Sequence, residues 1–319
     1  MARVLVTRRL PDGGLAPLER AGHEIVQRAD DTPFTHDELV AATVDVDAIV
    51  CLLTDRIDRE VLTAAASNGL RVVANVAVGY DNIDVPAATE LGIAVCNTPG
   101  VLDETTADLA FLLILAASRL AHTAEADLRE GRWKGWGVQQ YIGQDVHGAT
   151  LGLVGYGRIG QAVARRATGF GMTVLHHTRT DTGTPGWVGD LGALLHESDI
   201  VSLHVPLNDA TRHLIGAPEL ARMKRTAVLV NTARGPVVDE EALAGALEDG
   251  TIFAAGIDVF EREPEVHLRL LAAPRTVLLP HIGSASVATR TRMAQVAGEG
   301  VVAVLAGERP PNLVALKPA

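Results

Sequence analysis

The sequence predicts an α/β protein with two parallel sheets. Short apolar runs rich in β-branched residues alternate along the chain with longer amphipathic stretches. Strands that are apolar along their whole length are typical of parallel sheets that helices cover on both faces. The length of 319 residues corresponds to about two domains of ordinary size, so we expect one sheet in each.

The apolar runs fall into two groups, each of which predicts one sheet. The strands expected in the first group are 2–7, 47–53, 71–76 and 93–98. Those expected in the second group are 150–155, 172–178, 199–205, 226–231, 252–259 and 276–280. The helices expected between and after them are 58–68, 84–91, 103–131, 239–250 and about 284–306, with a loop containing Trp and Gly at 132–148.

Composition excludes several classes of protein. Lys and Arg number 28 against 39 Asp and Glu, so the formal net charge of −11 argues against broad binding to nucleic acid or anionic membranes. The lysines are only Lys134, Lys224 and Lys317, and none follows a glycine, which excludes a Walker-type phosphate loop. Cys51 and Cys96 lie within apolar runs, so we expect buried thiols and no metal site or redox pair.

The sequence predicts no membrane segment. No apolar run reaches the roughly 18 residues that a membrane-spanning helix needs. The apolar part of residues 1–10 is too short for a signal peptide. A cytoplasmic location is therefore the expectation.

A glycine-rich turn predicts a dinucleotide-binding site. Residues 150–160 read TLGLVGYGRIG, which places Gly155, Gly157 and Gly160 in a GxGxxG motif between an apolar strand and a helix. In that context the first glycine permits a tight turn, the second lets the backbone approach a pyrophosphate, and the third lets helix and strand pack closely. The N-terminus of the following helix then faces the phosphates.

The end of the next strand predicts which dinucleotide is preferred. A site for NAD usually has an acid there, which binds the ribose 2′-hydroxyl. This strand ends in Thr178, Arg179 and Thr180, and the first carboxylate is Asp181. An arginine flanked by hydroxyls would bind a 2′-phosphate. NADP(H) is therefore the predicted cofactor, and NAD(H) remains the alternative if Arg179 is only a solvated side chain.

Ionisable residues follow the last three expected strands. They are Arg234, then Glu261 and Glu263, and finally His281. Because ligands bind beyond the carboxyl ends of the strands in an open parallel sheet, we expect these side chains beside the cofactor.

These residue types fit the reduction of a 2-keto acid. Arg234 offers a planar set of donors to a carboxylate and the neighbouring carbonyl oxygen. His281 can donate a proton to that oxygen as hydride arrives from the nicotinamide. Glu263 can orient the imidazole and favour its charged form. Glu261 is a competing candidate for the acid, but the proline that follows Glu263 favours Glu263.

The chain resembles the D-isomer-specific 2-hydroxyacid dehydrogenases over nearly its whole length. The stretches that carry the resemblance include VANVAVGYDNIDV (73–85), GATLGLVGYGRIGQAVARRATGFGM (148–172), LVNTARGPVVDEEAL (229–243), AAGIDVFEREP (254–264) and LLPHIGS (278–284). Within the family, CLLTDRID (51–58) and the HTRT end of the strand at 172–178 are most similar to glyoxylate and hydroxypyruvate reductases.

The resemblance implies two similar α/β domains with the active site in the cleft between them. A flavodoxin-like substrate domain is expected at 1–99 plus 290–319, and a Rossmann cofactor domain at 100–289. The implied reaction reduces glyoxylate or hydroxypyruvate to glycolate or D-glycerate. The helix at 103–131 and the loop after it would form the contact of a homodimer.

The resemblance also implies the roles of single residues. Arg234, Glu263 and His281 match the catalytic residues of the family. The implied substrate-binding residues are Leu53, Val78, Gly79, Arg234 and His281. The implied cofactor-binding residues are Thr106, Gly155, Tyr156, Gly157, Arg158, Ile159, Gly160, Thr178, Arg179, Thr180, Val205, Pro206, Thr232, Ala233, Asp258, His281 and Gly283.

Two other functions remain open. A short phosphoglycerate dehydrogenase would bind a phosphorylated substrate, which calls for additional basic groups, and the loop at 73–85 contains none. A nucleotide-sensing protein related to the C-terminal-binding-protein corepressors would not need the catalytic residues. Trp133 and Trp136 could border a substrate pocket or pack at a subunit contact.

Overall fold

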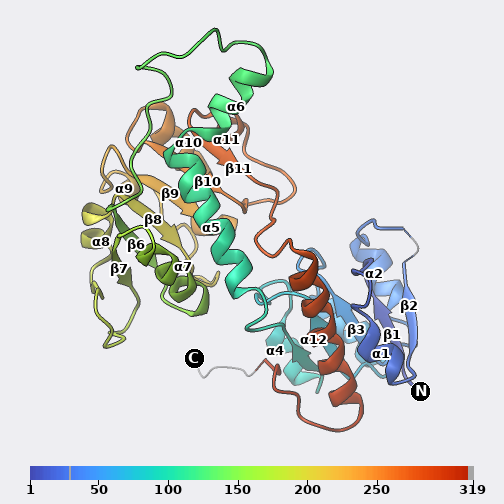
Figure 1. The fold of residues 1–319 in the computed structure, drawn as a ribbon. Helices are drawn as coiled ribbons and strands as arrows, with labels where there is room; N and C mark the ends of the chain where they lie inside the picture. The colour runs from blue at the N-terminus through green and yellow to red at the C-terminus, as the bar shows by residue number, and fades with distance from the viewer. Residues whose placement is uncertain (29, 315–319) are drawn as a thin grey trace. The chain divides into compact units, whose positions relative to one another are not determined.

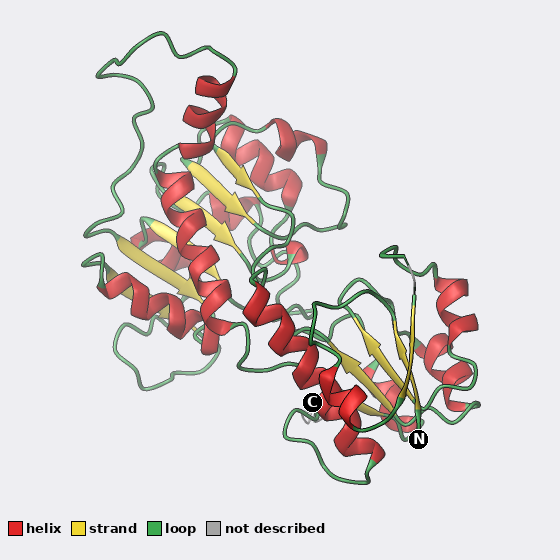
Figure 2. Ribbon diagram, turned by 45° about the vertical axis from the view of Figure 1, so that its right-hand side comes forward, coloured by secondary structure: helices red, strands yellow, loops and turns green. Residues whose placement is uncertain are grey.

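The computed structural model describes residues 1–28 and 30–314, and it contains two sheets flanked by helices (Figures 1 and 2). All strands pair in parallel, which confirms the predicted fold class. Contacts divide the chain into two units. Unit 1 comprises Met1–Leu102 and the chain from Ser284 onward, and unit 2 comprises Asp103–Gly283. The sequence predicts these boundaries after residue 99 and before residue 290.

Unit 1 is built on a five-stranded sheet in the order β2-β1-β3-β4-β5. Its strands are β1 (Arg3–Val6), β2 (Glu24–Gln27), β3 (Ala48–Cys51), β4 (Val72–Asn75) and β5 (Ala94–Cys96). Its helices are α1 (Ala16–Arg20), α2 (His36–Ala42), α3 (Arg59–Ala66), α4 (Val85–Glu90) and α12 (Val287–Leu305). The last helix, α12, packs against α1 and against β3, β4 and β5, so it belongs to the sheet formed by the start of the chain.

The apolar pattern did not predict β2. Its sequence, EIVQ, contains only two apolar residues, and both of its ends are exposed. It is an edge strand that pairs with β1 alone, with Glu24 opposite Arg3. An edge strand is bonded on one side only, so a short run with polar ends is sufficient to form it.

Unit 2 is built on a six-stranded sheet in the order β11-β10-β9-β8-β6-β7. Its strands are β6 (Thr150–Val154), β7 (Thr173–His177), β8 (Ile200–Leu203), β9 (Val228–Asn231), β10 (Ala254–Ile257) and β11 (Thr276–Leu278). Its helices are α5 (Asp103–Ser118), α6 (Ala121–Arg129), α7 (Arg158–Thr168), α8 (Leu191–Glu197), α9 (Ala217–Leu220), α10 (Glu240–Glu248) and α11 (Leu268–Ala272), with a 3₁₀ turn at Gly235–Val237. The strand order reverses between β6 and β8, which is where open α/β sheets bind ligands.

Apolar layers cover both faces of the unit 2 sheet. Leu113 of α5 and Val163 of α7 belong to one fully buried layer, and Leu194 of α8 and Leu247 of α10 belong to the other. Helix α5 lies close to the sheet, because a Cβ on Gly256 of β10 would lie only 2.8 Å from the Cβ of Leu113. This packing fixes the strand ends that carry the candidate site.

The expectation of one helix at 103–131 is wrong. Two helices, α5 and α6, occupy this stretch, and they are bent by 68° relative to each other. Leu120 between them has a left-handed φ of 52°. The amide of Gln144 donates to the carbonyl of Ser118 at 2.8 Å, so the loop after α6 returns to satisfy the end of α5. The apolar pattern of the sequence continues across Leu120, so the pattern could not reveal the break between the two helices.

The structure also locates the cysteines. Cys51 and Cys96 are both buried and free, and burial raises the pKa of the Cys96 thiol to about 12. Among the described residues, no group of His, Cys, Asp and Glu is arranged to hold a metal ion. In the same part of the chain, no single helix is long and apolar enough to cross a membrane, although the bent pair α5 and α6 together satisfies length and composition.

Candidate active site

Three candidate catalytic residues lie at one edge of the unit 2 sheet. Arg234 follows β9, Glu263 follows β10 and His281 follows β11, and these strands are neighbours in the sheet. Nδ1 of His281 lies 2.8 Å from Oε2 of Glu263. The two side chains are 25% and 26% exposed, so the pair is partly buried but can still meet a ligand.

The competing acid, Glu261, faces other residues. Its Oε1 accepts a hydrogen bond from the amide of Glu240 at 2.9 Å, and its Oε2 lies 3.3 Å from Nε2 of His213. The amide of Glu261 in turn donates to Oε1 of Glu240 at 2.6 Å. The two glutamates therefore bind each other's backbone, and Glu263 is the carboxylate beside the imidazole of His281.

The environment of Glu263 keeps its carboxyl ionised. Burial raises the pKa of Glu263, but the hydrogen bond and charge of His281, the amide of Phe260 and the charge of Arg234 together hold that pKa below its ordinary value. An ionised carboxylate accepts the proton on Nδ1 of His281, which leaves Nε2 as the nitrogen that can donate to a substrate.

A buried asparagine shapes the turn that carries Arg234. Asn231, the last residue of β9, accepts from the amide of Ala233 at 3.0 Å and donates to the carbonyl of Arg234 at 2.9 Å. Gly235 comes next, and a Cβ there would overlap the backbone of Phe260. The backbone of the turn after β9 therefore packs directly against the backbone of the segment after β10. This contact fixes the positions of the two segments relative to each other.

Asp258 lies beside these residues at the end of β10. It is 1% exposed, and its carboxylate accepts from the amides of Ile282 at 2.7 Å and Gly283 at 2.8 Å. Burial raises the pKa of Asp258 to about 6 in spite of these bonds. A Cβ on Gly283 would lie 3.2 Å from this carboxylate and 3.5 Å from the Thr106 side chain, so Thr106 of α5 borders the same place.

The glycine turn after β6 fits a bound dinucleotide. Gly155 has a φ of 96°, and a Cβ there would lie 2.5 Å from the carbonyl oxygen of His204 at the end of β8. A Cβ on Gly160 would overlap the carbonyl of Gly155, whereas Gly157 faces open space. Gly157 is also the N-cap of the 11-residue helix α7, and no side chain caps that helix. Its first amides are therefore open to an anion such as a pyrophosphate.

The remaining residues of this motif surround the turn. The ring of Tyr156 stacks on the imidazole of His176 of β7, with centroids 3.8 Å apart. Arg158 is exposed and begins α7, and Ile159 of the same turn packs against the apolar layer below.

Four further candidates follow the neighbouring strands. Val205 and Pro206 come after β8, and a Cβ on Gly155 would lie 3.0 Å from Val205. Thr232 and Ala233 come after β9. The hydroxyl of Thr232 is buried and has no hydrogen-bond partner among the described residues, which makes it a group that a ligand can satisfy.

Arg179 follows the end of β7 and is available to bind an anion. Arg179 is exposed, and within the described chain it makes no hydrogen bond or ion pair. The hydroxyl of Thr178 donates to the carbonyl of Thr180 at 2.7 Å and accepts from Nε1 of Trp187 at 3.1 Å. Asp181 accepts from the amide of Gly183 at 2.8 Å. The guanidinium of Arg179 is therefore more available to an anion than the hydroxyl of Thr178.

Unit 1 holds the other candidate residues. Val78 and Gly79 lie in the loop after β4, and their carbonyls accept from the side chains of Asn97 and Asn75, both at 2.8 Å. Their two amides donate to no acceptor among the described residues, so they are open to a carboxylate. Leu53 follows β3 and lines a hollow of about 410 Å³.

Several residues that shape the site were missed by the sequence reasoning. Asn75 and Asn231 are buried and each ends a strand, in VVAN and VLVN. Both organise the loop that follows. The signal was available, because a single amide side chain that ends an apolar strand must find hydrogen-bond partners inside the protein. Glu240 carried no such signal, since glutamate is common at the start of a helix.

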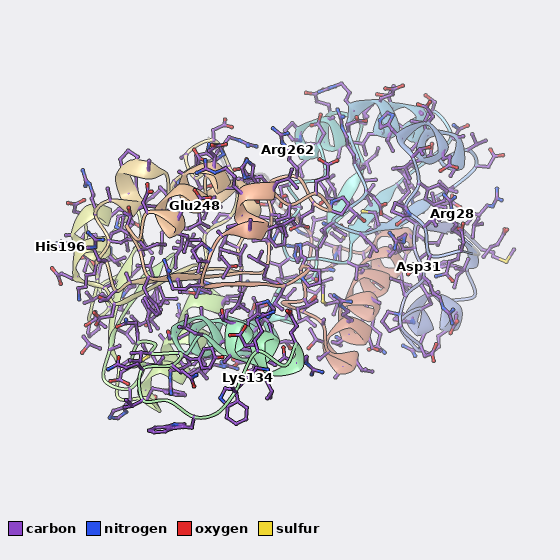
Figure 3. The ribbon with its side chains drawn as sticks, turned by 90° about the horizontal axis from the view of Figure 1, so that it is seen from above. Arg28, Asp31, Lys134, His196, Glu248 and Arg262 are labelled. Atoms are coloured by element: carbon purple, nitrogen blue, oxygen red, sulfur yellow. The ribbon has the colours of Figure 1, made fainter. Side chains whose placement is uncertain are left out.

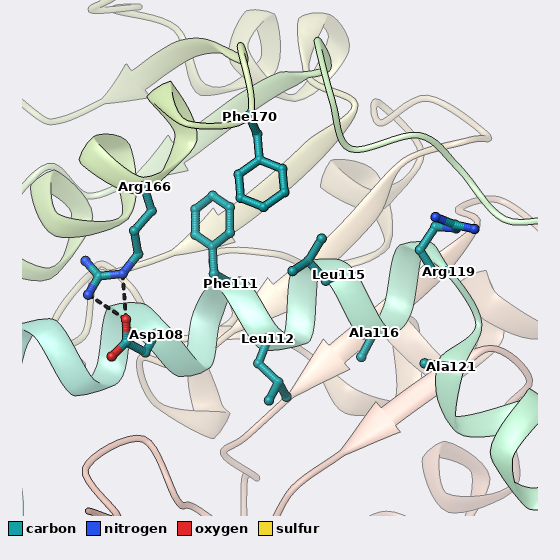
Figure 4. A pocket seen from close by; sticks show the side chains of 9 residues that line it. All are labelled: Asp108, Phe111, Leu112, Leu115, Ala116, Arg119, Ala121, Arg166 and Phe170. Atoms are coloured by element: carbon teal, nitrogen blue, oxygen red, sulfur yellow. Dashed lines mark hydrogen bonds and ion pairs between the residues drawn. The ribbon is translucent and has the colours of Figure 1, made fainter.

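An apolar hollow of about 730 Å³ lies along α5 (Figure 4). Its lining residues are Asp108, Phe111, Leu112, Leu115, Ala116, Arg119, Ala121, Arg166 and Phe170. None of them is a candidate catalytic or cofactor residue. The rings of Phe111 and Phe170 lie 5.2 Å apart, and Arg166 pairs with Asp108 at 2.6 Å. Leu112 and Leu115 remain 50% and 37% exposed.

The long loop after α6 carries more exposed apolar side chains. Trp133, Trp136, Val138 and Ile142 are all exposed, Trp136 to 84%. Lys134 lies on the same loop (Figure 3), and its Nζ donates to the carbonyl of Gly131 at 2.6 Å, next to α6.

Comparison with known proteins gives one consistent result. Residues 111–283 match the family model for the D-isomer specific 2-hydroxyacid dehydrogenase, NAD binding domain. A glyoxylate reductase of Korarchaeum cryptofilum is 52% identical over 98% of this chain and 95% of its own length. One of Thermococcus litoralis is 46% identical over 98% and 96%. The structure of an NADPH-dependent glyoxylate/hydroxypyruvate reductase from Sinorhizobium meliloti, in complex with NADP and malonate, has 37% identity and a TM-score of 0.84 over 98% of this chain and 97% of that one.

Proposed function

The chain belongs to the D-isomer specific 2-hydroxyacid dehydrogenases, and from that premise we propose that it reduces glyoxylate or hydroxypyruvate to glycolate or D-glycerate. The observation that carries the proposal is the contact between Nδ1 of His281 and Glu263, one strand away from the turn of Arg234. The similarity to glyoxylate reductases over the full length supports the choice of substrate.

Each catalytic side chain has one task in this reaction. The guanidinium of Arg234 binds the substrate carboxylate and polarises the keto oxygen. The ionised Glu263 keeps a proton on Nδ1 of His281 and stabilises the imidazolium. Nε2 of His281 then donates its proton to the keto oxygen, which becomes the hydroxyl of the product. When bound, the nicotinamide would supply the hydride that reduces the keto carbon.

The groups that bind the two ligands follow from the same geometry. The amides at the start of α7, beside Gly157, would hold the pyrophosphate, and Thr106, Thr232 and Asp258 would lie near the nicotinamide. In unit 1, the amides of Val78 and Gly79 are proposed for the substrate carboxylate, because they have no acceptor among the described residues.

An assay of the purified protein tests this function. Glyoxylate, hydroxypyruvate, pyruvate and 3-phosphohydroxypyruvate would each be added with NADPH or NADH, and the loss of cofactor absorbance measured. We expect the highest kcat/KM with glyoxylate or hydroxypyruvate. Absence of turnover with every acid would reject the proposal. A preference for the phosphorylated acid would instead identify a phosphoglycerate dehydrogenase.

We further propose that NADPH is preferred over NADH. Arg179 supports this, because an exposed guanidinium without a partner among the described residues can bind a 2′-phosphate. Arg179→Ala should raise KM for NADPH by about tenfold or more and leave KM for NADH within about twofold. Arg225→Ala, which removes another exposed arginine of unit 2, is the control. Wild-type protein that uses NADH about tenfold better than NADPH would contradict the preference.

We also propose a cytoplasmic homodimer. Two free thiols fit a reducing compartment. Leu112 and Leu115 on α5 form an exposed apolar patch beside the hollow, and the loop after α6 exposes further apolar side chains. Soluble monomers rarely expose large apolar patches. Phe111, Leu112 and Leu115 line the hollow, and these side chains suit an apolar surface on a partner. A second copy of this chain is therefore the proposed occupant.

Leu112→Asp should convert the dimer to a monomer, because it places a charge in an apolar contact. Light scattering coupled to gel filtration measures the change. Leu268→Asp is the matched control, because Leu268 is an exposed leucine of unit 2 on α11, outside this patch. Wild-type protein that is already monomeric, or a dimer that both substitutions leave intact, would refute the proposed contact.

A further inference from the structure

The backbone of His281 has an unfavourable conformation. Its φ is 54°, in the left-handed region, where the Cβ of a residue other than glycine is crowded. Its amide lies within hydrogen-bond distance of the carbonyls of Asp258 at 2.8 Å and Leu279 at 3.0 Å. Such a conformation persists only where surrounding contacts hold it, so the segment after β11 needs specific restraints.

Asp258 supplies those restraints. Its Oδ1 accepts from the amide of Ile282 at 2.7 Å and its Oδ2 accepts from the amide of Gly283 at 2.8 Å. Together with the bond from His281 to its carbonyl, Asp258 therefore binds three consecutive amides. The carboxylate is almost completely buried, so water does not compete strongly for these bonds.

We propose that Asp258 is a positioning residue for His281, in that its carboxylate holds the following two amides and so fixes the left-handed backbone that brings Nδ1 to Glu263. This inference rests on the proposed function, in which His281 is the proton donor. Rotating the backbone at residue 281 out of this conformation would move the imidazole away from Glu263, which itself is fixed by the amide of Phe260 at 3.0 Å.

The alternative is that Asp258 serves only the cofactor. It borders the place assigned to the nicotinamide, with Thr106 and Gly283 beside it. Both of its oxygens, however, already accept a backbone bond in the protein alone. A residue that acts only on the cofactor has no need to bind the two residues that follow the histidine. The two roles predict different effects on catalysis and on cofactor affinity.

Asp258→Asn separates these roles. The side chain keeps its size, but its NH₂ group faces one of the two backbone N–H donors, so that one bond is lost. We expect kcat with glyoxylate to fall by about tenfold or more, while the Kd of NADPH stays within about threefold. Hydrogen exchange of the free protein should show the amides of Ile282 and Gly283 exchanging about tenfold faster than in the wild type.

Asp239→Asn is the matched control. Asp239 also accepts a backbone amide, that of Ala242 at 3.0 Å, where it caps α10. The same Asp→Asn change removes a carboxylate charge elsewhere in unit 2, but the asparagine Oδ1 can still accept this single amide, so kcat should stay within about twofold of the wild type. A similar loss of kcat in both variants would mean that general destabilisation explains the effect, which would overturn the proposal.

Three other results would also overturn it. One is a Kd for NADPH raised about tenfold with unchanged exchange of Ile282 and Gly283. Another is a kcat within about twofold of the wild type. The third result applies if Asp258→Asn does not fold. In that case hydrogen exchange of the wild type is the test, because unprotected amides at Ile282 and Gly283 would contradict their bonds to Asp258. If the wild type turns over no 2-keto acid, the proposed function fails, while the exchange measurements still test what Asp258 binds.

Discussion

Substitution of His281 should reduce kcat by about 10²- to 10⁴-fold, the contribution of a general acid. His281→Asn is the informative change, because asparagine adopts the left-handed backbone found at this position more readily than most residues. The variant keeps the chain conformation and removes the imidazole. Stopped-flow or steady-state assays with saturating NADPH and glyoxylate measure kcat, and fluorescence titration measures the Kd of NADPH, which should stay within about threefold.

His213→Asn provides a matched control for this loss. His213 also has a left-handed φ, of 49°, and its Nε2 lies 3.3 Å from a glutamate, Glu261. It therefore shares the residue type, the backbone conformation and the kind of partner, but it is not at the end of β11. Its kcat should remain within about threefold of the wild type. A kcat that survives the loss of His281 would show that another group donates the proton, and equal losses in the two variants would show that the effect is not specific to His281.

The sequence allowed the fold and much of the site to be predicted because both depend on local patterns. Buried parallel strands are apolar along their whole length, as AIVC at Ala48–Cys51 and AAGI at Ala254–Ile257 illustrate. The ends of such strands share one edge of a sheet, so Arg234, Glu263 and His281 could be grouped without coordinates. The order of strands in the sheet, by contrast, is decided by long-range packing.

The features that sequence did not predict arise from contacts between distant segments. The break at Leu120 follows from the bond that Gln144 donates to Ser118, and the apolar pattern of α5 carries no trace of it. The distinct positions of Glu261 and Glu263, two residues apart, depend on the bond between Glu240 and Glu261 across two loops. The left-handed backbone of His281 depends on Asp258 in the same way.

Glu263→Gln should lower kcat/KM at neutral pH by about 10- to 100-fold. The substitution keeps the size of the side chain but removes the charge that faces Nδ1 of His281 at 2.8 Å. Hydrogen bonds to charged groups contribute about 1.5–3 kcal/mol, and 1.4 kcal/mol corresponds to a factor of ten in rate. The amide can still accept a hydrogen bond, so some orientation of the ring survives and the loss stays below that of His281→Asn.

The pH dependence of this variant tests the electrostatic part of the argument. Burial raises the pKa of Glu263, yet His281, the Phe260 amide and Arg234 together hold it below its ordinary value. The stabilisation from the ionised pair is therefore complete above the ordinary pKa of a glutamate, about 4.3, and it is lost as the pH falls through the lower pKa of the folded protein. The wild type should thus keep the pair at neutral pH and lose it only in acid.

In Glu263→Gln the acid-side loss of kcat/KM that comes from protonation of Glu263 should disappear, because the amide side chain has no charge to lose. The comparison between variants carries the information, because the two proteins differ only in the side chain at position 263. Glu261→Gln is the control, since this acid binds His213 and the amide of Glu240 and should leave the profile unchanged. Superimposable profiles for Glu263→Gln and the wild type would show that the charge of Glu263 does not support the proton donor.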